Sequence, residues 1–176
     1  MTMSNFENGF TDGILIRGIP ISTTHSGKVF YVSNAAAAKV AGAIDGSNTN
    51  PGTYRAPFKT LSYALTQCKA SRGDIIFVKP GHTEVVSTAG GIACSVAGVA
   101  IVGMGVGSLR PLITLTAAAA TVTITAANVS LVNLIFEAAF IDVVVGLDVS
   151  GVAGLTIDDC LFRDQATNLN YLNGIN

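Results

Sequence analysis

The sequence is poor in the residues that are typical of catalytic, metal-binding and nucleic-acid-binding proteins. Only 12% of its 176 residues are charged, the formal net charge is −1, tryptophan is absent and there are two histidines. Lysine and arginine form no run, so the composition gives no electrostatic reason to expect binding to nucleic acid or to an anionic membrane surface. What remains is a weakly charged chain in which 49% of the residues are hydrophobic.

The cysteines and histidines are scattered. Cys68, Cys94 and Cys160 form no CxxC pair and have no histidine at metal-ligand spacing. An odd, unclustered set predicts reduced thiols buried as small apolar residues, and hence an intracellular origin. His25 and His82 stand alone, and each is expected to cap or pack rather than to bind a metal. We therefore expect no metal and no cofactor.

One long uncharged stretch raises the question of a membrane span. Residues 111–136 carry no charge, which is long enough for a transmembrane helix. Polar and apolar residues alternate within this stretch, however, and it contains Asn128 and Asn133, which is typical of strands. The first ten residues also lack the basic and apolar regions of a secretory signal. The sequence predicts neither a membrane span nor a secretory leader.

We expect three zones along the chain. Residues 1–34 form a leader or arm with short strands, residues 35–81 a loop, a capping helix and a first buried strand, and residues 82–176 the body of the fold. The leader is rich in apolar side chains, among them Phe6, Phe10, Ile14 and Ile16. It is therefore expected either to fold back on the domain or to pack against another subunit.

One helix is predicted, over residues 58–70. Pro57 suits the position before it, because the N–H that proline lacks would have no partner there. Lys69 and Arg72 lie at its negative end, and Gly73 is expected to end it. The predicted apolar face consists of Leu61, Ala64, Leu65 and Cys68. A buried strand over residues 74–78 follows, stopped by Pro80 and Gly81.

Three segments then repeat, at 97–105, 127–136 and 153–162, each preceded by a further short strand at 92–96, 121–125 or 146–150. In the alignment of the repeats the matching sets are Val99, Val129 and Leu155; Ile101, Leu131 and Ile157; and Gly103, Asn133 and Asp159. Repetition at this period predicts a solenoid whose matched apolar side chains stack in one interior. Glycine, asparagine and aspartate tolerate a left-handed backbone, which predicts a corner at the third set. A β-sandwich, the alternative, does not explain that recurring residue.

The last coil of a solenoid needs a cover. The amphipathic helix is placed to plug the N-terminal end. Residues 168–176 carry no amphipathic or charged closing element. We expect that either a partner covers this end or the chain continues.

The sequence resembles known β-helix proteins. Residues 45–81, with Asp45, Gly46 and Ser47, then Gly52 and Thr53, then 57–61 and 73–81, resemble the opening segment of pectate-lyase-like right-handed β-helix proteins. The resemblance implies an all-β fold, a right-handed parallel β-helix (solenoid) with one N-terminal capping α-helix. It implies little about activity, because this fold carries lyases, hydrolases and inert structural proteins.

A narrower resemblance extends into the leader. Residues 8–21, 27–34, 72–82 and 96–111 are similar to a family of small β-helix proteins encoded among the structural genes of tailed bacteriophages. It implies a virion structural protein that decorates or stabilises the capsid shell from outside, a cement protein made in the cytoplasm of the bacterial host. The implied partners are the major capsid protein and further copies of the chain, as a homo-oligomer that we expect to be a trimer. Phe6, Phe10, Ile14 and Ile16 are the expected partner contacts.

Other candidate sites are weaker. The glycines of residues 103–107 suggest a dinucleotide turn, but no helix and no suitably spaced acid follows, so a solenoid corner is favoured. Asp158 and Asp159 are neighbours that point to opposite faces of a strand, which places them poorly for paired acid chemistry. His82 and Glu84 could form an exposed polar pair, although a solvated turn is favoured.

The rival function is a carbohydrate-binding or polysaccharide-degrading module of the tailspike kind. It predicts exposed aromatic and acidic side chains along the coils. Between residues 89 and 157 the charged residues are only Arg110, Glu137, Asp142 and Asp148, which is sparse for a catalytic cluster. We therefore expect no catalytic residue and no enzymatic activity.

Overall fold

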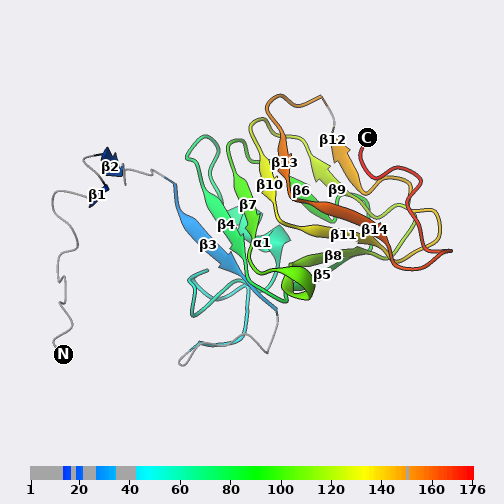
Figure 1. Ribbon diagram of the computed structural model, residues 1–176, viewed down its shortest axis with the longest axis horizontal. Coiled ribbons are helices and arrows are strands. Elements are labelled where there is room, and N and C mark those ends of the chain that lie inside the picture. Colours follow the sequence, from blue (N-terminus) through cyan, green and yellow to red (C-terminus); the bar gives the residue numbers. More distant parts are fainter. Residues whose placement is uncertain (1–13, 17–18, 22–26, 35–42, 150) are drawn as a thin grey trace.

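The protein is a parallel β-helix, seen in a computed structural model that describes residues 14–16, 19–21, 27–34, 43–149 and 151–176 (Figure 1). The described residues form three complete coils and part of a fourth, and strands of successive coils lie side by side in three parallel sheets. The five-stranded sheet contains β3 (Val29–Val32), β4 (Ile75–Val78), β7 (Ala100–Gly103), β10 (Ser130–Val132) and β13 (Thr156–Asp158). The four-stranded sheet contains β5 (Thr83–Val86), β8 (Leu112–Leu115), β11 (Ile135–Ala138) and β14 (Leu161–Asp164). The three-stranded sheet contains β6 (Ile92–Cys94), β9 (Val122–Ile124) and β12 (Leu147–Val149).

The repeats stack in the predicted register. Leu131 pairs with Ile101 of the preceding coil and with Ile157 of the following coil, in parallel strands. Because these pairs join successive coils rather than two facing sheets, the β-sandwich alternative is wrong. The predicted fold class, a right-handed parallel β-helix with a capping helix, is confirmed. The short strands expected before each repeat are the members of the three-stranded sheet.

The interior is filled by ladders of similar side chains. On the four-stranded sheet, Ile113, Phe136 and Phe162 occupy one register position. The rings of Phe136 and Phe162 stack with centroids 4.9 Å apart and planes 13° apart. Phe136 is completely buried, whereas Phe162 in the last coil is only half-buried. Stacking identical rings in this way buries large apolar surfaces at little cost in packing.

The corner predicted at the third set of the alignment is present, but for two different reasons. Asn133 and Asp159 adopt left-handed backbone with φ of 56° and 48°, as predicted. Gly103 is not among the residues with positive φ, so the prediction is wrong there. Glycine is needed at 103 because a Cβ atom would collide with the carbonyl oxygen of Asn133 in the next coil. Close approach of two backbones, rather than a left-handed turn, selects this glycine.

A second left-handed corner, which the sequence analysis missed, lies at the start of the same strands. Gly98, Asn128 and Gly154 have φ of 74°, 56° and 71°. The N–H of Gly98 donates to the carbonyl oxygen of Ala127, and that of Asn128 donates to Ala153, at 3.0 and 2.9 Å. The corner thus repeats its hydrogen bond from coil to coil, as the strands do.

The helix is shorter than predicted. α1 spans Leu61–Gln67 and begins after Thr60, whose side chain accepts a hydrogen bond from the Tyr63 N–H. Phe58 is instead extended, because its N–H donates to the carbonyl oxygen of Tyr31 at 2.9 Å and it forms a bridge with Val32. This pairing with β3 prevents the chain from becoming helical at Pro57. The predicted apolar face is confirmed, since Leu61, Ala64, Leu65 and Cys68 are all buried.

The predicted C-terminal end of the helix is also wrong. Cys68 caps α1, and its N–H donates to the carbonyl oxygen of Leu65. The Arg72 side chain donates from Nε and Nη2 to Asp74, each at 2.6 Å, rather than to the helix. Helix α1 contacts β3, β4 and β6 and so covers the interior of the first coil.

The C-terminal segment continues the coil. Tyr171 forms a parallel bridge with Val143, and Ile175 forms one with Leu147. The Tyr171 ring meets the edge of the Phe162 ring with centroids 6.4 Å apart. Although the sequence predicts no closing element here, this segment pairs with residues 143–149 and extends the stack on that side.

The leader is divided. One of its short strands is β3, which folds back and pairs in parallel with β4. β1 (Ile14–Ile16) and β2 (Ile19–Ile21) form an antiparallel hairpin. The structure describes the backbone of these two strands but not their side chains. Phe6, Phe10 and His25 lie outside the described residues.

The thiols and the uncharged stretch behave largely as predicted. Cys68 and Cys94 are free and buried, and Cys160 is free and half-buried. Burial raises the pKa of both the Cys68 and Cys94 thiols to about 12. The uncharged stretch forms β8, β9 and β10. In the described part of the chain, no helix has the length and apolar character required to cross a membrane.

Candidate functional site

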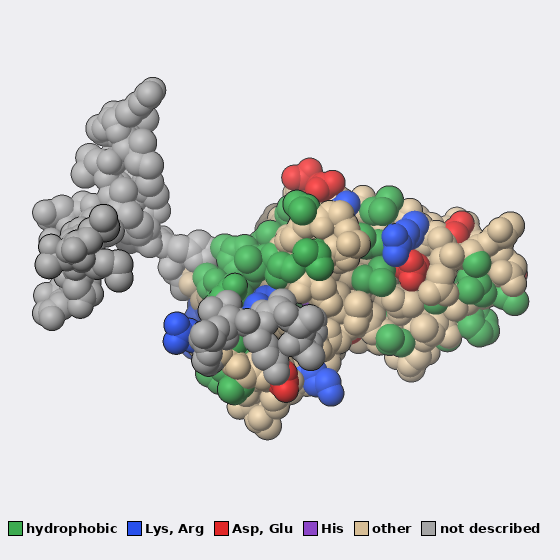
Figure 2. Space-filling view, turned by 60° about the horizontal axis from the view of Figure 1, so that its bottom comes forward, with side chains coloured by type: hydrophobic (Ala, Val, Ile, Leu, Met, Phe, Trp, Pro, Cys, Tyr) green, Lys and Arg blue, Asp and Glu red, His purple; other side chains and the backbone are tan. Residues whose placement is uncertain are grey.

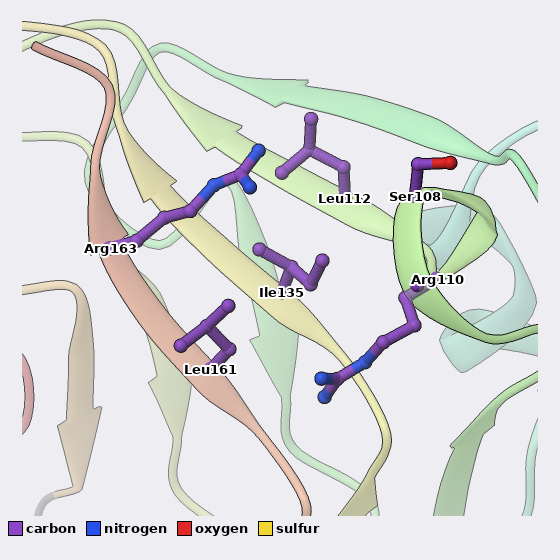
Figure 3. Close-up of a pocket in the computed structure, with 7 residues that line it drawn as sticks. Ser108, Arg110, Leu112, Ile135, Leu161 and Arg163 are labelled. Atoms are coloured by element: carbon purple, nitrogen blue, oxygen red, sulfur yellow. The ribbon is translucent and has the colours of Figure 1, made fainter.

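A groove lies on the outer face of the four-stranded sheet (Figure 3). Its floor is formed by Leu112, Ile135 and Leu161, which occupy one register position in β8, β11 and β14. Residues at this position alternate with the inward-facing ladder of Phe136 and therefore point outward. The result is an aliphatic stripe that runs across three strands. Its volume of about 450 Å³ lies in the range of small-ligand sites.

Arg163 forms one side of the groove. Its Nε and Nη2 donate to Oε2 of Glu137 at 2.7 and 2.6 Å, across neighbouring strands. Gln165 donates to the other oxygen of Glu137 at 3.4 Å. Glu137 is 6% exposed, whereas the Arg163 side chain is 46% exposed, so the guanidinium is the accessible member of the pair. A guanidinium has five N–H donors, which leaves Arg163 able to bind a further acceptor.

Arg110 forms the other side. Its Nη2 donates to the backbone carbonyl oxygens of Leu134 and Asp159. The carboxylate of Asp159 is 3.8 Å away and its side chain is 71% exposed, which makes this a weak surface pair. Nε of Arg110 is buried without a hydrogen-bond partner. Gly107 and Ser108, in the 3₁₀ turn Gly107–Leu109, complete the wall beside it.

The lining determines what the groove can do chemically. It combines aliphatic side chains with two guanidinium groups, and a guanidinium stays protonated and cannot act as a general base. Such a surface is suited to bind a group that has both an apolar part and an anionic part.

An apolar patch lies beside the end of the last complete coil. We use the name C-terminal apolar patch for Phe140, Ile141, Val144, Leu172 and Ile175, which are 43–57% exposed. They come from the 139–145 turn and from the C-terminal segment. The Leu172 N–H donates to the carbonyl oxygen of Val143 at 2.8 Å, which holds the two segments together. Figure 2 shows hydrophobic side chains at the right-hand end of the molecule, whereas the Lys and Arg side chains on this face lie towards its middle and left.

His82 and Glu84 are not the solvated turn favoured by the sequence analysis. His82 is 1% exposed and Glu84 9%, and Nε2 of His82 lies 3.0 Å from Oε2 of Glu84. Nδ1 of His82 accepts the Asn34 N–H at 3.1 Å, so the ring proton belongs on Nε2 and is donated to Glu84. Glu84 also accepts the Leu61 N–H at 2.7 Å, at the start of α1. The pair joins the capping helix to the first coil.

The other sites considered from the sequence do not assemble. Residues 103–107 lead from β7 into the 3₁₀ turn, which makes them a corner of the solenoid. Asp158 lies at the end of β13 and Asp159 at the left-handed corner, and both are exposed. Of the expected partner contacts, Phe6 and Phe10 lie outside the described residues, and the side chains of Ile14 and Ile16 are not described. Among the described residues no group of three or more His, Cys, Asp or Glu could hold a metal ion.

The sequence analysis missed the groove. A signal was available, since Ile135 and Leu161 are apolar at positions that alternate with the inward-facing Phe136 and Phe162. An apolar residue at an outward position in two successive coils indicates a surface that is covered by something else. The two arginines could not be placed beside it from spacing alone, because Arg110 lies in a corner and Arg163 in a strand.

Comparison with known proteins defines the family but not a function. No curated protein matches the chain. Among solved structures it is similar to a rhamnogalacturonan lyase, with 20% sequence identity and a TM-score of 0.48 over 70% of this chain and 33% of that chain. The chain thus spans about a third of the length of that protein. A family profile described as "Protein of unknown function (DUF1565)" matches residues 44–166, and the chain belongs to that family.

Proposed function

We propose that the chain is a bacteriophage virion structural protein, which decorates the capsid shell from outside and stabilises it as a homo-oligomer. The C-terminal apolar patch is the observation that carries this proposal. Five large apolar side chains remain 43–57% exposed on the chain alone. Soluble proteins rarely keep such a group uncovered, because contiguous exposed apolar surface favours association.

The rigidity of the fold supports the same role. Each coil is held to its neighbours by parallel strands and by stacked inner side chains such as Phe136 and Phe162. A stiff element can bind two neighbouring subunits of a shell without bending. Its contribution would be the apolar area covered at each seam, about 25 cal/mol per Å², summed over many copies.

The partners in this proposal are the major capsid protein and further copies of the chain. The leader, with Phe6, Phe10, Ile14 and Ile16, is the proposed contact with the shell. Its composition supports this, because these residues are too apolar for a free polar tail.

The test uses particles produced by the genome that carries this gene. Particles are purified on a density gradient, and the chain is quantified against the shell protein by mass spectrometry. We expect a fixed ratio, and we expect particles that lack the chain to lose their contents at a lower temperature. A double Phe6→Ser and Phe10→Ser variant should no longer be incorporated into particles. The control variant Ile44→Ser, at an exposed apolar residue outside the leader, should still be incorporated. Absence of the chain from the particles would overturn the proposal.

The rival function is a carbohydrate-binding or polysaccharide-degrading module. The surface that suits it best is the groove between Arg110 and Arg163. That surface is aliphatic, since Leu112, Ile135 and Leu161 form its floor, whereas the rival predicts aromatic and acidic side chains. A glycan array and a depolymerisation assay with the full chain test it. Specific sugar binding that Leu161→Asp abolishes would favour the rival.

A further inference from the structure

We propose that two surfaces of this chain bind each other in neighbouring copies: the 139–145 turn of one copy inserts into the outer-face groove of the next. The inference deepens the assembly role proposed above by naming a second copy as the partner. It concerns the purified chain alone and requires no shell.

The turn has the chemistry of a protruding plug. Phe140 and Ile141 are 43% and 54% exposed, and Val144 is 48% exposed. Between them Asp142 is exposed and has left-handed backbone with φ of 53°. Its carboxylate accepts a hydrogen bond from the neutral Asn170 amide at 3.3 Å, which leaves its negative charge uncompensated by this contact. The turn therefore presents large apolar groups together with one acid.

The groove has the complementary chemistry. Its floor of Leu112, Ile135 and Leu161 is aliphatic and its sides are the guanidinium groups of Arg110 and Arg163. Figure 3 shows the two arginines on opposite sides of the aliphatic stripe. A volume of about 450 Å³ has room for large apolar side chains, and either guanidinium can receive a carboxylate. An apolar plug with one acid matches an apolar groove that has a guanidinium on each side, of which Arg163 is already paired with Glu137 but keeps further N–H donors.

The positions of the two surfaces favour a contact between different copies. Ile135 begins β11 and lies in the groove, whereas the turn follows the other end of that strand after Ala138. Four extended residues separate the two surfaces by on the order of 10 Å along the sheet. In the structure no residue of the turn lines the groove of its own chain. A contact between two different patches is head-to-tail, the kind that closes into a ring of identical chains or grows into an open filament.

The first measurement is the mass of the purified full chain by size-exclusion chromatography with light scattering. We expect an oligomer. Phe140→Asp, which alters the plug, and Leu161→Asp, which alters the groove, should each shift the mass to that of a monomer. Ile44→Asp is the matched control, since Ile44 is 55% exposed at the opposite end of the β-helix, and it should leave the oligomer intact. Circular dichroism and thermal melting confirm that each variant folds.

The second measurement mixes the two variants. The Phe140→Asp chain keeps an intact groove and the Leu161→Asp chain keeps an intact turn, so one wild-type contact remains between them. We expect a 1:1 heterodimer at concentrations where each variant alone is a monomer. Should Leu161→Asp fail to fold, Leu112→Ser replaces it in both measurements.

Several outcomes would overturn the inference. These are a wild-type chain that is monomeric at submillimolar concentration, an oligomer that survives either variant, and variants that stay monomeric when mixed. Persistence of the oligomer in Phe140→Asp would assign the contact to another surface, such as the leader. If the chain oligomerises as expected but is absent from particles, this inference stands and the proposed virion role fails.

Discussion

The two ends of the β-helix differ in how their last coil is covered. At the N-terminal end the inward residues Ile76 and Val78 of β4 are 0% and 1% exposed, between the coils that follow and β3 with helix α1. At the C-terminal end Ile157, in the ladder of Ile76, and Phe162, in the ladder of Ile113, are only partly buried. β13 and β14 are terminal strands of their sheets. One end is closed by non-repeating chain and the other is covered only in part.

Among the described residues, the buried carboxylates Asp74 and Glu84 lie at the N-terminal end, whereas a third, Glu137, pairs with Arg163 within the coils. Within the coils each strand satisfies its backbone through its neighbours, so no side chain is needed. Where the loop and α1 meet the first coil, carboxylates replace the missing carbonyl oxygens. Asp74 accepts the N–H groups of Lys28 and Lys69 at 2.7 and 2.8 Å, and Glu84 accepts that of Leu61. A regular stack thus needs ionisable residues mainly where its regularity ends.

The largest expected loss of stability comes from removing an inner aromatic ring. Comparing this loss between two coils tests whether the last coil is packed as tightly as the inner ones. Phe136→Ala should reduce the free energy of unfolding by about 3–5 kcal/mol, because the ring is completely buried. Phe162→Ala, at the same register position one coil further on, should cost about half as much because the ring is already partly exposed. Urea unfolding followed by circular dichroism measures both. Equal losses would mean that the C-terminal end is covered in solution.

The next prediction concerns the charged closure of the N-terminal end. Burial by itself raises the pKa of Asp74, but hydrogen bonds from Arg72 and from the N–H groups of Lys69 and Lys28 outweigh it and lower the pKa to about 2. Because this value lies below the ordinary 3.8, the carboxylate contributes stability above about pH 4, and loses it as the pH falls towards 2. The contribution is about 2 kcal/mol.

Asp74→Asn tests it directly. The variant should be less stable than the parent at neutral pH and should lose less stability between pH 4 and pH 2. Asp158→Asn, on an exposed strand end, is the control and should leave the profile unchanged. A parent and an Asp74 variant with parallel profiles would contradict the prediction.

A smaller effect is expected at the C-terminal end. The hydroxyl of Tyr171 is buried without a hydrogen-bond partner, which costs stability. Tyr171→Phe keeps the ring against Phe162 and removes the orphaned oxygen, so it should be neutral or stabilising by up to about 1 kcal/mol. Thermal melting measures the difference, with Tyr54→Phe as an exposed control. A clear loss of stability would show that the hydroxyl has a partner.

The mildest test requires no substitution. Burial raises the pKa of Cys68 and Cys94 to about 12, and both thiols lie in the closed part of the β-helix. Burial also raises the pKa of Cys160, partly offset by its hydrogen bond with the Leu134 backbone and by Arg110, but this thiol is only half-buried. A disulfide exchange reagent should therefore label Cys160 first, and the other two only on unfolding. Peptide mapping of the labelled chain identifies the order.

The fold was predictable because it repeats. Matching residues such as Ile101, Leu131 and Ile157 recur at intervals that only stacked coils can use, so their register followed from alignment. The helix boundary was not predictable, because Phe58 pairs with a strand that precedes it by more than twenty residues. Local signals at Pro57 favoured a helix, and a tertiary bridge with Val32 outweighed them.

The candidate site was less accessible from the sequence. The outward apolar positions of Ile135 and Leu161 indicate the floor of the groove in the sequence. No such pattern indicates Arg110 and Arg163, which form its sides. Arg110 reaches carbonyl oxygens from residues 134 and 159, and nothing in the spacing of these residues indicates that they meet. The burial of His82 had no local signal either, because α1 and residue 34 enclose it from a distance.

The sequence by itself determined the solenoid, its strand register, the corner at Asn133 and Asp159 and the apolar face of the capping helix. These features depend on periodic side-chain patterns and on local backbone preferences, which are properties of short segments. Only the tertiary structure decided the length of α1, the buried carboxylates of Asp74 and Glu84, and the groove between Arg110 and Arg163. Each of these arises where segments from different coils, or from outside the repeat, come into contact, and no period in the sequence records such a contact.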